Sequence, residues 1–131
     1  MGERTFAISY DSALLPLFAV MGLGPRYSRV TVTADAVHVR LGWAFRASVP
    51  RSAVRRVAAD DGAVLGWGAH GRRGRWLVNG SSKGLVKVTV DPPAAATVAG
   101  WPVRVHELRL SLEAPGFFMA TLRPRDSGAR P

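Results

Sequence analysis

The stretch that decides the fold is GWGAHGRRGRWLVNGSSKG, which runs from Gly66 to Gly84. It holds two of the four tryptophans, one of the three histidines and six of the fourteen glycines. Glycine allows the positive φ angles that tight turns require. The stretch therefore predicts two short segments joined by tight turns with basic side chains at their tips, and we expect further strands to pack around it.

The totals favour one domain. A length of 131 residues suits a single domain, which we expect over residues 1–122, followed by a disordered polar tail at residues 123–131. The absence of cysteine excludes disulfides, thiolate metal sites and cysteine nucleophiles. The longest apolar run, from Ala13 to Leu23, is too short to span a membrane. We expect a cytoplasmic protein, with a peripheral position at a membrane as the alternative.

Apolar and polar side chains alternate in most of the remaining chain, which is typical of half-buried strands. Without long helical crossovers, these strands predict an antiparallel β-sandwich or partly open barrel of about seven strands. The alternating segments are Thr5–Tyr10, Arg29–Thr33, Val37–Leu41, Phe45–Val49, Val54–Val57, Trp76–Val78, Val86–Val90 and Val103–Leu112.

Two helical segments are predicted. Near the amino end, Ser12 could cap a short helix whose apolar residues include Phe18. Near the carboxyl end, Pro115 suits a first helical turn, and Phe118 and Leu122 are spaced to close one face over the core.

Proline marks a further expected boundary. Asp91-Pro92-Pro93 is expected to end the strand before it, because proline lacks the N–H that a strand donates. Residues 94–100 are then expected to form a short helical turn or a loop.

The chain is strongly basic, with a net charge of +9 and sixteen arginines against two lysines. Such a bias reflects codon usage in a GC-rich genome together with solubility, or it indicates an anionic partner such as nucleic acid or a lipid headgroup. The candidates for one basic face are Arg51, Arg55, Arg56, Arg72, Arg73, Arg75 and Lys83.

Two glycine motifs in the central stretch do not fit their usual context. Gly66, Gly68 and Gly71 have the spacing of a dinucleotide fingerprint, but a helix should follow and a strand is predicted instead. Gly71-Arg72-Arg73-Gly74 has the form of a KH-domain loop, which joins two helices that are not predicted here. The pattern favours a basic hairpin tip without a nucleotide cofactor.

Catalytic and metal sites are not expected. The three histidines lack metal-ligand spacing, and most of the aspartates fall in predicted turns. Trp67, His70 and Trp76 lie close enough in sequence to line a small-ligand pocket. Tryptophans in small β domains are more often anchors of the core or its rim.

Residues 108–122, LRLSLEAPGFFMATL, resemble the end of bacterial pleckstrin-homology-like domains, where a last strand passes an acidic residue and a proline into a capping helix. The segment SVPRSAV at 48–54 is similar to that family as well. The stretches LGPR at 23–26 and WGAHG at 67–71 resemble uncharacterised actinobacterial members.

The resemblance implies a seven-strand sandwich or barrel closed at one end by the carboxyl-terminal helix. It carries no enzymatic activity, cofactor or metal, and some relatives self-associate. Three functions stay open: a non-catalytic module for protein–protein contact or self-association, a binder of anionic surfaces through the Arg72, Arg73 and Arg75 loop, and a small-ligand binder or enzyme built on Trp67, His70 and Trp76.

Overall fold

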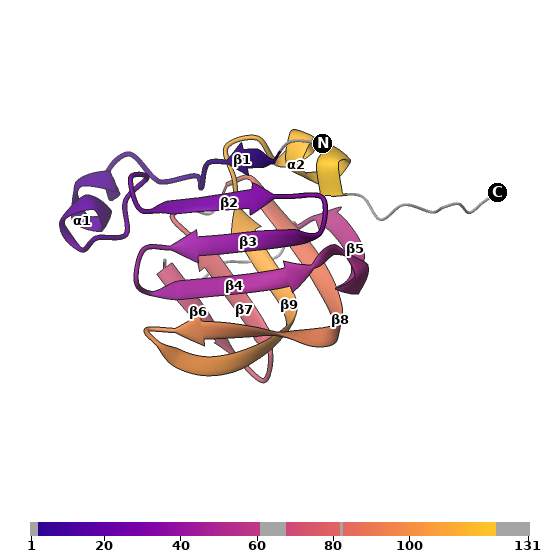
Figure 1. Ribbon diagram of the computed structural model, residues 1–131. Coiled ribbons are helices and arrows are strands. Elements are labelled where there is room, and N and C mark those ends of the chain that lie inside the picture. The colour runs from indigo at the N-terminus through magenta and orange to yellow at the C-terminus, as the bar shows by residue number, and fades with distance from the viewer. Residues whose placement is uncertain (1–2, 61–67, 82, 123–131) are drawn as a thin grey trace.

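The computed structural model describes residues 3–60, 68–81 and 83–122, with the backbone alone for 68–72. Within them the chain is mainly β, as predicted (Figure 1). The strands are β1 (Arg4–Phe6), β2 (Ser28–Val32), β3 (Ala36–Leu41), β4 (Phe45–Pro50), β5 (Val54–Ala59), β6 (Gly68–Arg72), β7 (Arg75–Asn79), β8 (Leu85–Val98) and β9 (Trp101–Ser111). The helices are α1 (Leu15–Val20), the 3-10 turn η1 (Arg51–Ala53) and α2 (Pro115–Leu122).

The described strands form one sheet in the order β1-β2-β3-β4-β8-β9-β7-β6, with β5 paired to β8. The sheet curls because β8 pairs with β5 along its first part and with β4 along its last part. In Figure 1, β2, β3 and β4 form a front half, while β6, β7 and β9 cross behind them at a steep angle. The predicted partly open barrel is confirmed.

The length of β8 corrects the sequence prediction. The strand does not end at Asp91-Pro92-Pro93 but continues to Val98, so residues 94–98 are neither a helical turn nor a loop. The register between β8 and β9 shifts between Thr89 and Ala94. Proline is tolerated at such an irregularity because no ladder hydrogen bond depends on its missing N–H.

Two further features differ from expectation. The pairing of β7 with β9 is parallel, from Arg75 opposite Glu107 to Val78 opposite Leu110. Strand β8, which lies between them in sequence, runs antiparallel to β9 and so acts as the crossover connection that a helix provides in other folds. The β6–β7 hairpin of the Gly66–Gly84 stretch lies at the edge of the sheet. The long β8–β9 hairpin, rather than that stretch, occupies the centre.

The predicted turn in the central stretch is confirmed. Arg72 pairs with Arg75, so Arg73 and Gly74 form a two-residue hairpin turn. Both have positive φ, 55° and 81°, as such turns require. Nε2 of His106 donates to the Arg73 carbonyl at 2.8 Å, which ties the turn to β9.

The carboxyl-terminal helix covers the core as predicted. Phe118 and Leu122 are buried among the inward-facing valines and leucines of the sheet. The Phe118 ring meets the Phe6 ring edge to face, with their centroids 5.3 Å apart. Such pairs add stabilisation to that of apolar burial.

The amino-terminal helix starts later than its expected cap. Leu14 occupies the N-cap position and its side chain accepts no capping hydrogen bond, so the prediction of Ser12 as the cap is wrong. The turn is held instead by the Asp11 carbonyl, which accepts from the backbone of Leu14 and Leu15. Phe18 is buried against the Tyr10 ring, with 5.2 Å between centroids.

Candidate anion-binding surface

The predicted basic residues Arg56 and Arg75 share the outer face of the rear half of the sheet. Cross-strand pairs join them through Thr89 and Glu107, so three strand spacings of about 4.8 Å separate them, roughly 14 Å. Glu107 lies between them, with its carboxylate 4.0 Å from the Lys87 ammonium. A negative charge therefore interrupts this face.

Arg51 and Lys83 lie elsewhere. The Arg51 guanidinium donates to the carbonyls of Thr33, at 3.2 Å, and Thr121, at 2.9 Å, and so fixes the β2–β3 turn to α2. Lys83 follows β7, whereas Arg73 precedes it, so β7 holds the two apart. Arg55 is exposed on β5. The structure does not gather the predicted basic residues into one cluster.

The predicted pocket residues are placed only in part. Trp67 lies outside the described residues, and His70 and Arg72 are described by their backbone on β6 alone. Trp76 is half-buried on β7, with its ring centroid 6.2 Å from that of Phe45. It fits the predicted role of a core anchor. Trp101 does not, because its side chain is 76% exposed at the β8–β9 turn, beyond the core.

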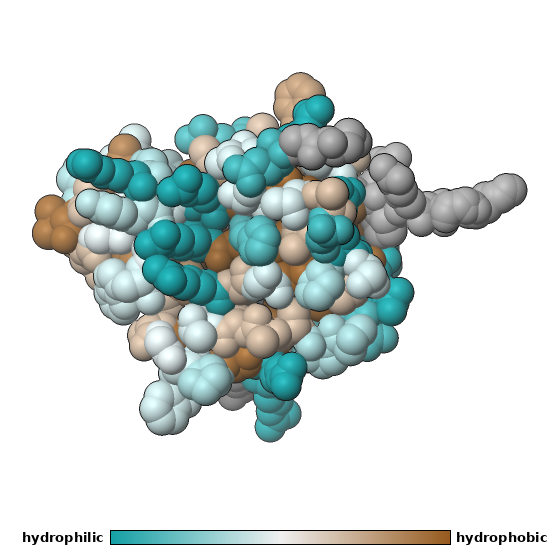
Figure 2. Space-filling view, viewed as in Figure 1, coloured by the Kyte–Doolittle hydropathy of each residue, from teal (hydrophilic) through white to brown (hydrophobic). Residues whose placement is uncertain are grey.

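A different basic cluster lies on the outer face of the front half. Arg29 pairs with Arg40 across β2 and β3, and Arg40 pairs with Arg46 across β3 and β4. We call these three residues the arginine column. Paired Cβ atoms lie about 5 Å apart, so the three side chains start within roughly 10 Å of one another. Figure 2 shows hydrophilic side chains stacked over the α1-side ends of these strands.

The arginine column has no counter-charge among the described residues. None of the three guanidinium groups forms an ion pair or hydrogen bond there, and Nε of Arg40 is buried without an acceptor. Like charges placed directly opposite on a sheet are destabilising. The column therefore holds a concentration of positive charge that the rest of the described chain does not neutralise.

Sequence reasoning missed the column although a signal for it was present. Arg40 and Arg46 stand at equal distances from the β3–β4 turn at residues 42–44, and Arg29 and Arg40 do so from the β2–β3 turn at residues 33–36. In an antiparallel hairpin, residues equidistant from the turn are register partners on the same face. Working out the register of both hairpins would have brought the three arginines together.

Exposed apolar side chains gather beside the column. Of eight large hydrophobic residues that are exposed among those described, seven lie on or near α1 or in neighbouring turns, and we call this region the α1 end. They are Leu15, Leu17, Val20, Met21, Tyr27, Trp43 and Trp101. In Figure 1, α1, the β3–β4 turn and the β8–β9 turn project at the same end of the molecule.

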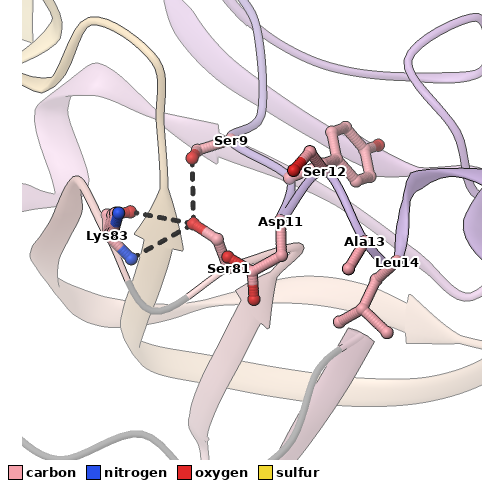
Figure 3. Close-up of a pocket in the computed structure, with 8 residues that line it drawn as sticks. Ser9, Asp11, Ser12, Ala13, Leu14, Ser81 and Lys83 are labelled. Carbon is pink, nitrogen blue, oxygen red and sulfur yellow. Dashed lines mark hydrogen bonds between the residues drawn. The ribbon is translucent and has the colours of Figure 1, made fainter.

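An open pocket of about 590 Å³ lies between the amino-terminal segment and the β7–β8 loop (Figure 3). Its hydroxyls bind one another: Ser9 Oγ lies 2.9 Å from Ser81 Oγ, which accepts from the Lys83 backbone N–H at 3.1 Å. No histidine lines the pocket among the described residues. The hydroxyls hold the amino-terminal segment against the loop.

Tyr10 beside this pocket gives the fold a pH dependence. Burial raises the pKa of the Tyr10 hydroxyl, an effect that a hydrogen bond with the Ser28 side chain opposes, and the hydroxyl donates to the Leu23 carbonyl at 2.7 Å. An unfolded tyrosine ionises near pH 10, while the folded one stays neutral to higher pH. Stability from this group is therefore complete below about pH 10 and is lost as pH rises through the folded pKa.

Tyr10→Phe should remove that alkaline loss. At pH 8 it should cost only about 0.5–1.5 kcal/mol, because Ser28 Oγ also donates to the Leu23 carbonyl, at 3.0 Å. Urea unfolding of both proteins at pH 8 and above pH 10 measures the effect. If the variant loses as much stability at high pH as the wild type, Tyr10 is not the responsible group.

Neither a metal cluster nor a spanning helix is found in the described parts of the chain. No three histidine, aspartate or glutamate side chains there are grouped to hold an ion, and no helix there has the length and apolar character to cross a bilayer. No protein-family model, no curated protein and no solved structure matches this chain. The resemblance to pleckstrin-homology-like domains stays a prediction.

Proposed function

We propose that this domain is a non-catalytic interaction module of pleckstrin-homology-like fold that binds an anionic partner through the arginine column. The observation that carries the proposal is the alignment of Arg29, Arg40 and Arg46 without a carboxylate or other described partner. The basic tip at Arg73 and Arg75 takes a secondary place, because Glu107 adjoins Arg75 across the β7–β9 pairing.

The physical support is the chemistry of guanidinium on a rigid sheet. Each arginine presents a planar fork of donors that matches carboxylate or phosphate oxygens in pairs. The strand pairing fixes the backbone positions from which the three side chains start. Binding therefore has to order the arginine side chains but not the backbone that carries them. An anion would also relieve the repulsion between neighbouring arginines, which favours the bound state.

A second candidate function is protein–protein contact or self-association. The exposed apolar residues of the α1 end favour it, since apolar patches on a protein surface often mark interfaces. Light scattering after size exclusion separates a dimer from a monomer. A dimer that disappears when Val20 and Trp101 are replaced by serine would support this second function.

The anion-binding proposal is tested with two triple variants that lose the same charge. One replaces Arg29, Arg40 and Arg46 by glutamine, and its matched control replaces Arg55, Arg56 and Arg75. We call the first of these the column variant, after the arginine column. On immobilised heparin eluted with a salt gradient, the column variant should elute at a markedly lower salt concentration than the control. Equal elution of the two variants would overturn the proposal.

Stability separates lost binding from misfolding in the same experiment. Without ligand at low salt, the column variant should unfold at a urea concentration equal to or above that of the wild type, because the repulsion is gone. A column variant that is clearly less stable would show that the arginines support the fold instead.

A further inference from the structure

The α1 end is held together as one surface. Nε1 of Trp43 donates to the Met21 carbonyl at 2.7 Å, which fixes the β3–β4 turn to the end of α1. The Ala99 backbone N–H donates to the Ala44 carbonyl at 2.9 Å, which fixes the β8–β9 turn to the β3–β4 turn. The apolar side chains of all three segments are thus presented from backbone that the fold positions.

The side chains of this end are unusually exposed for their type. Val20 is 86% exposed and Trp43 is 58% exposed. Apolar side chains that remain in water do not gain the stabilisation that burial would give. A group of them on one end of a domain marks a surface that another apolar phase covers.

Positive charge borders this surface and negative charge is missing from its segments. Residues 12–34, 36–59 and 92–106 contain no aspartate or glutamate. The pair Arg40–Arg46 of the arginine column lies one residue pair inside Leu41–Phe45, the last pair before the β3–β4 turn. The guanidinium of Arg26 lies 5.9 Å from the Tyr27 ring centroid.

We propose that the anionic partner is a phospholipid membrane of negative surface charge, into which the α1 end inserts while the arginine column contacts the headgroups. This inference rests on the proposed anion-binding function and names its partner. Tryptophan favours the boundary between headgroups and acyl chains, and arginine beside it gains from the negative surface potential. Apolar area and basic charge then add to one another in binding.

Other occupants fit the same surface less well. Nucleic acid would supply phosphates for the arginines and bases for the tryptophans, but it offers no apolar phase to Leu17, Val20 and Met21. A second copy meeting this end through a two-fold axis would face the same surface, so it would bring one arginine column towards another. An anionic bilayer satisfies the charges and the aliphatic side chains together.

The experiment measures binding of the full chain to vesicles of phosphatidylcholine with and without phosphatidylglycerol. Binding should require the anionic lipid and fall with salt. The column variant should lose on the order of 100-fold in affinity for three basic residues. Val20→Ser with Trp101→Ser should lose roughly tenfold or more, whereas Phe117→Ser, which removes a 72% exposed side chain near α2, should bind as the wild type.

A second readout reports insertion directly. Lipids brominated in their acyl chains should quench tryptophan fluorescence of the bound protein. Trp43→Phe with Trp101→Phe should remove most of this quenching while binding persists, since phenylalanine still inserts. Quenching that survives in this variant would overturn insertion at the α1 end.

The outcomes distinguish this inference from the function on which it rests. Heparin binding through the column without vesicle binding would overturn the membrane inference and keep the anion-binding function. Vesicle binding that ignores the Val20 and Trp101 changes would overturn insertion. A dimer in solution that dissociates when Val20 and Trp101 are replaced would show that a second copy covers the α1 end. Failure of both heparin and vesicle binding would end both proposals.

Discussion

Phe118→Ala is expected to lower the free energy of unfolding by about 3–5 kcal/mol. Phe118 has no exposed surface, and its ring meets Phe6 of β1 at 5.3 Å. Removing it leaves a cavity where α2 joins the sheet, and the packed core can collapse only partly around it. Because a domain of this size has a total stability of about 5–15 kcal/mol, the change should move the urea midpoint strongly.

The neighbouring residue is the matched control. Phe117 is 72% exposed on the same helix, so Phe117→Ala should change the stability by no more than about 0.5 kcal/mol. Phe118→Leu keeps most of the buried volume and should fall between the two. Equal midpoints for Phe117→Ala and Phe118→Ala would mean that α2 does not cover the core.

The position of α2 over the core could be predicted because every local signal agrees there. Leu110 and Leu112 alternate into the core, Pro115 begins the helix, and Phe118 and Leu122 are one turn apart on one face. The β2–β3–β4 meander was predictable for the same reason, since each strand alternates cleanly between short turns. Periodicity succeeds where pairing is local.

The centre of the sheet was less predictable. Two consecutive prolines indicate a strand end, and only the register shift after Thr89 allows β8 to continue to Val98. The parallel pairing of β7 with β9 depends on contacts distant in sequence, which alternation does not encode. Both features decide how the sheet curls. The sequence therefore predicted a partly open barrel but not that β8, which pairs with β5 and then with β4, would be its central strand.

The candidate surface was missed for a related reason. Linear clustering favours Arg72, Arg73 and Arg75, which are adjacent in sequence. Arg29, Arg40 and Arg46 are separated by whole strands and come together only when the hairpin registers are fixed. On one face of a sheet, alternate residues of each strand lie beside alternate residues of the neighbouring strands. Charged residues that are far apart in sequence can therefore be neighbours, and the density of charge along the chain does not locate such a group.

Gly84→Ala is expected to cost about 3–5 kcal/mol, the sum of two separate effects. Gly84 has a φ of +66°, which costs a residue with a Cβ about 1–2 kcal/mol. A Cβ there would also overlap the carbonyl oxygen of Leu112. The backbones of the two residues are already joined, because the Leu112 N–H donates to the Gly84 carbonyl at 3.0 Å.

Gly100→Ala isolates the conformational part of that cost. Gly100 has a φ of +84° and no heavy atom within 4 Å of the position a Cβ would take, so its substitution should cost only about 1–2 kcal/mol. Urea unfolding followed by circular dichroism gives both values, and their difference measures how closely the start of β8 approaches the end of β9. This close approach of Gly84 to Leu112 positions the end of β9 and the chain that leads to α2. Equal costs for the two substitutions would mean that the contact at Leu112 is looser than described. The position of α2 would then depend on the burial of its own side chains alone.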